Sequence, residues 1–94
     1  MRKTYVFGND FWEFYNSQKK EVPVKYFKHL EGTDGLFEIR IKVGSDIYRI
    51  ICFFDEGNLI ILLNGFQKKS EKTPSREIEK AKLLKLKYYE EKSK

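Results

Sequence analysis

Hydrophobic and polar residues alternate through the middle of the chain and predict a small β-sheet. Apolar residues occupy every second position over residues 37–43, with charged residues between them, which is typical of a strand with one buried face. A turn signal at residues 44–46 leads to a nearly continuous apolar strand over residues 47–54. The hairpin signal at residues 55–58 leads to a third strand over about residues 59–66. This order predicts a three-stranded antiparallel meander.

The residues before this meander predict one strand and two helices. The β-branched and aromatic residues at positions 4–7 are typical of a short strand. The Asn-Asp pair at residues 9–10 can cap a first helix, and residues 24–30 fit a second helix. We expect Gly32 and Gly35 to close this helical region.

A third helix is predicted after the meander. Thr73 has the side chain of a helix N-cap, Pro74 suits the first helical position, and the helix is expected to end near Tyr89. Its residues predicted to face the sheet are Ile78, Ala81 and Leu84. Residues 1–94 are therefore expected to form one α+β domain. Its small antiparallel sheet, an N-terminal strand plus the meander, would be packed by two N-terminal helices and the C-terminal helix.

The composition excludes several classes of site. A single cysteine, Cys52, cannot form an intramolecular disulfide, and a single histidine, His29, cannot supply a two-histidine metal or acid–base site. Cys52 lies in an apolar strand and is expected to be a buried hydrophobic residue. The longest strongly apolar run, residues 60–63, is far shorter than the roughly 20 residues of a membrane span. We see no secretion signal and expect a cytoplasmic protein that does not bind a membrane. We also expect that it needs no metal or cofactor.

The basic charge is concentrated at the C-terminal end. The net charge is +5; residues 1–66 contain nine basic and nine acidic side chains, whereas residues 67–94 contain ten and five. Clustered lysine favours a polyanionic partner, and nucleic acid is the simplest one. A solvated helix face explains the same pattern equally well.

Arg49 is unusual because the rest of its strand is almost entirely apolar. In one register Val43 pairs with Tyr48, and the charged side chains of both strands share a face. In the other, Val43 pairs with Ile47, and Arg49 joins the apolar face and requires a buried acid. The first register separates core from charge and predicts a basic face suited to phosphate, although a structural Arg49–Glu38 pair is an alternative. This charged face would contain Glu38, Arg40, Lys42 and Arg49.

An ordered set of short segments covers more than half of the chain and resembles a known family. The segments are Leu36-Phe37-Glu38-Ile39-Arg40, Tyr48-Arg49-Ile50, Leu63-Asn64-Gly65-Phe66-Gln67-Lys68-Lys69-Ser70, Lys72-Thr73-Pro74 and Glu77-Ile78-Glu79-Lys80-Ala81. In this order and spacing they resemble the HigB group of RelE-type toxins, including its phage-derived members. The ordered set of segments is more specific to this family than any single segment.

The resemblance implies the RelE-like fold and the toxin of a type II toxin–antitoxin pair. Such a toxin is a metal-independent endoribonuclease that cuts mRNA on the ribosome and inhibits translation, and a helix-turn-helix antitoxin of the HigA type holds it inactive. The family's active site lies on the strands and on the loop after the last strand. Carried over, the catalytic residues are Arg49, Lys68 and Lys69, and the RNA-binding residues are Arg40, Lys42 and Lys72.

The implied chemistry gives these residues distinct roles. The planar guanidinium of Arg49 is suited to hold two oxygens of the reacting phosphate, and Lys68 or Lys69 to take or give a proton. Some relatives use a histidine or a C-terminal tyrosine as proton carrier, and neither has a match here. His29 lies outside the matching segments, and Tyr88 and Tyr89 lie in the predicted C-terminal helix. The identity of the general base stays open.

Two other functions fit the same residues. A protein with this fold that binds RNA or the ribosome without cutting would keep the basic surface. A protein-interaction module would instead use that surface to bind an acidic protein partner.

Overall fold

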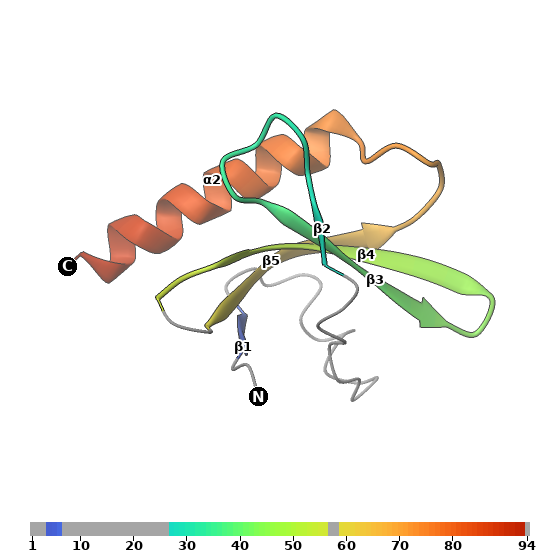
Figure 1. The fold of residues 1–94 in the computed structure, drawn as a ribbon, viewed down its shortest axis with the longest axis horizontal. Helices are drawn as coiled ribbons and strands as arrows, with labels where there is room; N and C mark the ends of the chain where they lie inside the picture. The colour runs from blue at the N-terminus through green and yellow to red at the C-terminus, as the bar shows by residue number, and fades with distance from the viewer. Residues whose placement is uncertain (1–3, 7–26, 57–58, 94) are drawn as a thin grey trace.

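A computed structural model of the chain describes residues 4–6, 27–56 and 59–93, and five strands and one helix lie in these ranges. The strands form one sheet in the order β1-β5-β4-β3-β2, in which β1 runs parallel to β5 and the other neighbours are antiparallel. The helix lies across one face of this sheet (Figure 1). The elements are β1 (Thr4–Val6), β2 (Lys28–His29), β3 (Phe37–Val43), β4 (Asp46–Phe54), β5 (Ile60–Gln67) and α2 (Ser75–Lys92).

The predicted packing by two N-terminal helices is wrong. The second of these helices, expected over residues 24–30, is contradicted by β2, which pairs with β3 at the edge of the sheet. The first, expected from residues 9–10 onward, lies outside the described residues. In the described part of the chain, α2 is the one helix, and the RelE-like arrangement is not shown.

Residues 28–29, which were expected to be helical, are extended because β3 offers them a hydrogen-bonding edge. Lys28 lies opposite Glu38 in this pairing. Gly32 and Gly35, which were expected to end a helix, both have positive φ (75° and 73°) and lie in the loop that returns the chain to β3. The backbone N–H of Leu30 closes this loop by donating to the oxygen of Leu36 at 2.9 Å.

The β3–β4 hairpin has the predicted faces but a different register. Val43 lies opposite Asp46, and the two residues between them form the turn, where Gly44 has a φ of +63°. Neither predicted pairing of Val43 is correct. Because the true register differs from the preferred one by two residues, the same side chains still share each face. The change places Arg40, and not Lys42, opposite Arg49.

Each face of the sheet carries its own hydrophobic cluster. The cluster beneath α2 includes Ile51, Phe53, Ile61, Leu63, Ala81 and Tyr88, with Ile78 and Leu84 packed against it. The helix residues predicted to face the sheet are therefore confirmed. The cluster on the other face includes Ile39, Ile50, Cys52, Ile60 and Leu62. Burial raises the pKa of the Cys52 thiol to about 12, which confirms Cys52 as a buried hydrophobic residue.

Helix α2 starts one residue later than expected and ends closer to the C-terminus. Its N-cap is Pro74, which makes no side-chain capping bond, so the prediction of Thr73 as N-cap is wrong. The Thr73 hydroxyl donates instead to Glu38 on β3 at 2.5 Å. The helix extends to Lys92, and no helix in residues 27–56 and 59–93 is long and apolar enough to cross a membrane.

The last turns of α2 are attached to the end of β4 through Asp55. The Asp55 side chain is 5% exposed; it accepts hydrogen bonds from Lys92 Nζ at 2.7 Å and from Tyr88 Oη at 2.6 Å. Lys92 first, and then Tyr88, lower the pKa of Asp55 from 3.8 to about 2. Tyr88 and Tyr89 both contact this carboxylate and pack on Phe53, so both side chains help to attach α2 to the sheet.

This attachment predicts a loss of stability in acid. A carboxylate whose pKa is lower in the folded chain stabilises it fully above the unfolded value near pH 4, and the stabilisation is lost as the pH falls toward 2. Urea unfolding at pH 7, 4 and 2.5 should show a larger acid-induced fall in the free energy of unfolding for the wild type than for Asp55→Asn. Equal falls in both proteins would contradict this role for Asp55.

Candidate RNA-binding site

Arg49 lies in the middle of β4 and is buried beneath the loop that joins β5 to α2. Its side chain is 1% exposed, and its Nε lies 3.3 Å from Oε1 of Glu38, which is 2% exposed. Nη2 donates to the backbone oxygen of Glu71 at 2.8 Å, and Nη1 donates to Thr73 Oγ1 at 3.4 Å. Since Thr73 also donates to Glu38, the contacts form a closed set. We call Arg49, Glu38, Glu71 and Thr73 the Arg49 network.

The Arg49 network replaces the open basic face predicted for the sheet. The alternative pairing of Arg49 with Glu38 is the one that the structure has. Because only 1% of its side chain is exposed and its donors are directed to Glu71 and Thr73, Arg49 offers little surface to an RNA phosphate. As placed, Arg49 serves the site by fixing the loop of residues 68–74, which carries the other cations.

Two further bonds hold this loop. The backbone N–H of Lys68 donates to the oxygen of Ile47 at 2.7 Å, and the Ser70 hydroxyl donates to the oxygen of Lys72 at 2.9 Å. A loop tied to the sheet at several points presents its side chains in fixed directions, which a binding site requires.

The predicted catalytic lysines differ in their surroundings. Lys68 is 17% exposed and pairs with Glu71 at 3.3 Å. This lysine is the largest cause of the lowered pKa of the Glu71 carboxyl, with smaller contributions from Arg40 and Arg49. Lys69 is exposed and lines two of the pockets beside the loop. Lys69 is therefore better placed than Lys68 to meet a ligand.

The predicted RNA-binding residues lie around the same loop, except for Lys42. Arg40 is 45% exposed and its Nε contacts Glu38 Oε1 at 3.4 Å, which attaches it to the Arg49 network. Lys72 is exposed on the loop. Lys42 is exposed near the β3–β4 turn and lines none of the three pockets described next.

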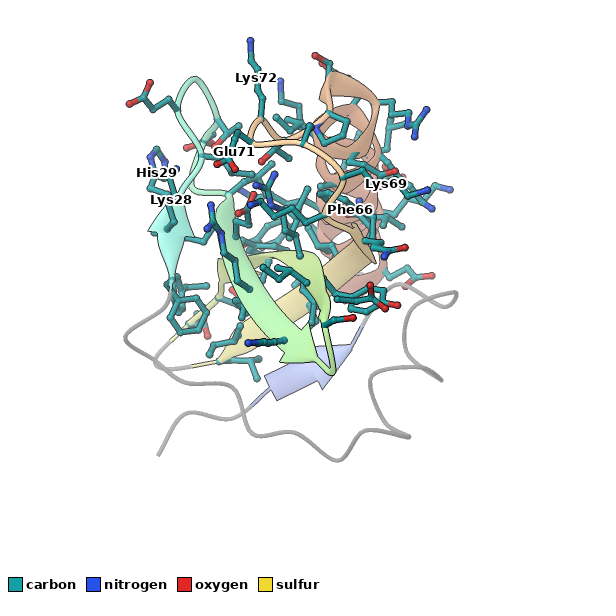
Figure 2. All side chains as sticks on the ribbon, turned by 90° about the vertical axis from the view of Figure 1, so that its right-hand side faces the viewer. Lys28, His29, Phe66, Lys69, Glu71 and Lys72 are labelled. Atoms are coloured by element: carbon teal, nitrogen blue, oxygen red, sulfur yellow. The ribbon has the colours of Figure 1, made fainter. Side chains whose placement is uncertain are left out.

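Surface pockets formed by described residues lie beside the loop on three sides. Lys28 and His29 lie on one side of it and Phe66 on the other (Figure 2). The β2-side pocket, about 450 Å³, includes Lys28, Arg40, Glu71 and Lys72. The turn-side pocket, about 310 Å³, includes Asp46, Gln67, Lys68 and Lys69. The helix-start pocket, about 250 Å³, is lined by Arg49, Phe66, Gln67, Lys69, Ser70, Lys72, Pro74, Arg76 and Glu77.

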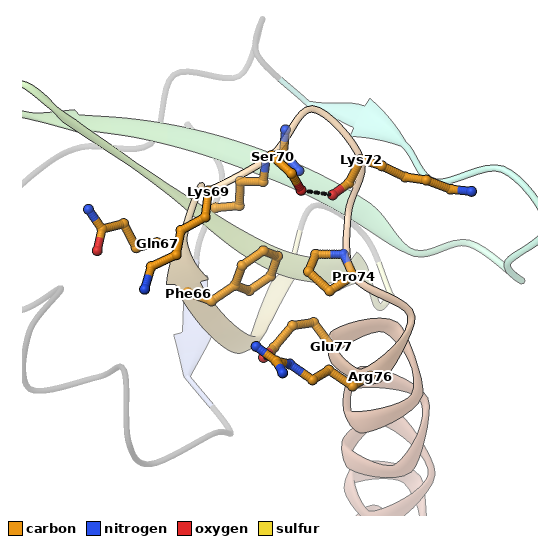
Figure 3. A pocket seen from close by; sticks show the side chains of 9 residues that line it. Phe66, Gln67, Lys69, Ser70, Lys72, Pro74, Arg76 and Glu77 are labelled. Atoms are coloured by element: carbon orange, nitrogen blue, oxygen red, sulfur yellow. Dashed lines mark hydrogen bonds and ion pairs between the residues drawn. The ribbon is translucent and has the colours of Figure 1, made fainter.

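The helix-start pocket combines an aromatic surface with cations. The half-buried Phe66 ring lies near Pro74, and Arg76 and Glu77 lie at the beginning of α2 (Figure 3). An aromatic ring can stack on a base, and Lys69 and Arg76 can contact phosphate. The first turn of a helix also favours anions, because its N–H groups point toward the ligand.

Sequence reasoning did not identify Arg76 and Glu77 as site residues. Both follow Pro74 and Ser75 directly, and a charged pair at a helix start after a basic loop is the signal that could have found them. Phe66 could be recognised as an aromatic residue able to stack, but its position beside Arg76 depends on how α2 packs on the sheet.

A family model for the phage derived protein Gp49-like family (DUF891) matches residues 7–85. The chain belongs to this family. Gp49-like proteins are associated with RelE-type, toxin-like proteins, which agrees with the resemblance in residues 36–89 at the level of a toxin-like role. No curated protein matches this Gp49-like chain. Among the residues that the structure describes, no three His, Cys, Asp or Glu side chains are grouped so that they could hold a metal ion.

Proposed function

We propose that this Gp49-like protein is the toxin of a type II toxin–antitoxin pair and cuts mRNA on the ribosome, as HigB-type toxins do. The observation that carries the proposal is the helix-start pocket. In this pocket the Phe66 ring of β5 can stack on a base, and the exposed Lys69 and Arg76 can contact its phosphates; Lys69 lies on the loop that the Arg49 network fixes.

The reaction needs little chemistry from the protein because RNA carries its own nucleophile. The 2′-hydroxyl attacks the adjacent phosphorus in line, the bond to the 5′-oxygen breaks, and a 2′,3′-cyclic phosphate forms. Negative charge grows on the non-bridging oxygens, where Arg76 can stabilise it. The ribosome would supply the backbone orientation, which is worth several kcal/mol of the barrier. Free RNA should therefore be cut slowly or not at all.

A helix-turn-helix antitoxin is the partner in this proposal. Leu83 and Leu86 are 61% and 58% exposed on α2, and these apolar side chains offer contacts to a protein partner. Co-expression with the product of a neighbouring reading frame that encodes such a protein should restore growth of cells that make the toxin.

A reporter assay tests the proposed activity. Purified protein added to a bacterial translation extract should stop synthesis of the reporter and shorten its mRNA, because the transcript is cut as it is read. Reporter synthesis at the rate of a buffer control would contradict the proposal.

Non-catalytic binding to RNA or the ribosome is the second candidate, and two observations favour it. Arg49 is committed to the Arg49 network, and Lys68 is paired with Glu71, so two of the three predicted catalytic cations already have partners. In that case the protein would reduce reporter synthesis while the mRNA stays at full length.

A further inference from the structure

Glu77 is the one carboxylate among the described residues that line the helix-start pocket. Its side chain is 18% exposed, so it is reachable from the pocket without being freely solvated. Its neighbours there include the cations Lys69, Lys72 and Arg76. A carboxylate in a cationic pocket weakens the attraction of that pocket for a polyanion. Its presence there therefore calls for a separate role.

A buried amide fixes the position of this carboxylate. Asn64 on β5 is 4% exposed, and its Nδ2 donates both to Glu77 Oε1 at 3.0 Å and to the Glu77 backbone oxygen at 3.1 Å. Asn64 Oδ1 is buried with no hydrogen-bond partner in the described part of the chain. A buried oxygen without a hydrogen bond destabilises the folded chain, so Asn64 has a cost beside its two bonds to Glu77.

Helix capping does not account for this arrangement. A glutamate at the third helical position usually reaches back to the backbone N–H of the N-cap residue. The N-cap here is Pro74, which has no N–H. The carboxylate bonds to Asn64 instead, and its second oxygen, Oε2, lies 3.8 Å from Nε of Arg76. Oε2 is thus next to a cation suited to phosphate and is not used by Asn64.

We propose that Glu77 is the general base of the cleavage reaction, an inference that rests on the proposed function. Oε2 takes the proton of the 2′-hydroxyl as its oxygen forms the bond to phosphorus. The phosphorus–O5′ bond breaks, and the Lys69 ammonium gives the leaving 5′-oxygen a proton. The products are a 2′,3′-cyclic phosphate and a free 5′-hydroxyl. Glu77 and Lys69 then exchange protons with solvent, which restores both groups.

Arg76 and Phe66 complete this assignment. Arg76 precedes Glu77 on the first turn of α2, so one helix turn would present both a phosphate-binding cation and the base (Figure 3). A nucleotide whose base stacks on Phe66 would place its ribose between the ring and the helix start. The 2′-hydroxyl and its phosphate would then lie near Glu77 and Arg76.

Glu77→Gln tests the assignment, with Glu79→Gln as the matched control. The glutamine keeps an oxygen that can accept from Asn64 but cannot take a proton, so cleavage on ribosomes should fall about 10²–10⁴-fold. Ribosome binding, measured by sedimentation, should stay within about threefold. Glu79 carries the same charge on the exposed side of α2, where it pairs with Lys82, and its variant should cut at the wild-type rate.

The pH dependence separates a proton role from a structural one. The pH profile of cleavage should differ between the wild type and Glu77→Gln, because only the carboxylate can take a proton from the 2′-hydroxyl. Glu77→Asp, which keeps a carboxylate, should recover part of the rate. Wild-type cleavage by Glu77→Gln, or a loss confined to particular codons, would overturn the assignment. Absence of cleavage by the wild type would overturn the proposed function and this inference with it.

Discussion

Replacing Arg49 with methionine is expected to lower the free energy of unfolding by about 3–5 kcal/mol. The substitution removes the buried guanidinium partner of the Glu38 carboxylate, which keeps only the partly exposed Arg40, and it removes the bonds that hold Glu71 and Thr73. For a domain of this size, whose total stability is on the order of 5–15 kcal/mol, the loss is large. Urea unfolding monitored by circular dichroism measures it.

Two variants control for this effect. Arg40→Met removes the exposed partner of the same carboxylate and should cost less than about 1 kcal/mol. The double variant Glu38→Met/Arg49→Met leaves no unpaired buried charge and should recover most of the loss. A loss below 1 kcal/mol for Arg49→Met alone would show that the buried pair does not hold the loop. Because of this stability cost, an inactive Arg49 variant would not identify Arg49 as catalytic.

The triple variant Lys69→Ala/Lys72→Ala/Arg76→Ala is expected to reduce cleavage on the ribosome by at least about 10²–10³-fold. All three side chains are exposed cations that line the helix-start pocket, and none belongs to the Arg49 network. Binding to RNA should also become less sensitive to salt. With up to three phosphate contacts removed, the slope of log K against log salt should fall by roughly 2–3.

The control removes the same charge elsewhere. Lys80→Ala/Lys82→Ala/Lys87→Ala changes three exposed lysines of α2, of which Lys87 lies about 18 Å along the helix axis from its first residue. This variant should keep cleavage near the wild-type rate. Equal losses in the two triple variants would show that total charge decides the activity and that the pocket does not.

Much of the sheet could be predicted from local pattern. Alternation over residues 37–43 corresponds to β3, because successive side chains of a strand point to opposite faces, and the continuous apolar run before Asp55 corresponds to β4, which is buried on both faces. The predicted faces of β3 and β4 are correct although the predicted register is wrong, because the error is two residues and an even shift keeps each side chain on its face. The helix predicted over residues 24–30 failed because the pairing of β2 with β3 is a tertiary contact that local spacing does not contain.

The candidate site was harder to predict because its contacts join distant residues. Arg49 was recognised as unusual, but Thr73 lies 24 positions away from it and 35 from Glu38, so the closed network depends on the path of the loop. The basic segment of Lys68 and Lys69 was identified correctly as lying after the last strand. The loop's conformation decides that Glu71 pairs with Lys68 and that Lys69 stays exposed. Residue type alone does not specify that conformation.

Primer extension on a defined mRNA, translated in a bacterial extract with and without the purified protein, tests the central claim most directly. The proposed activity predicts discrete cuts in register with codons, absent when ribosomes are omitted and reduced in the Lys69→Ala/Lys72→Ala/Arg76→Ala variant. Intact mRNA on ribosomes that bind the protein would contradict the claim of cleavage and identify a non-catalytic binder.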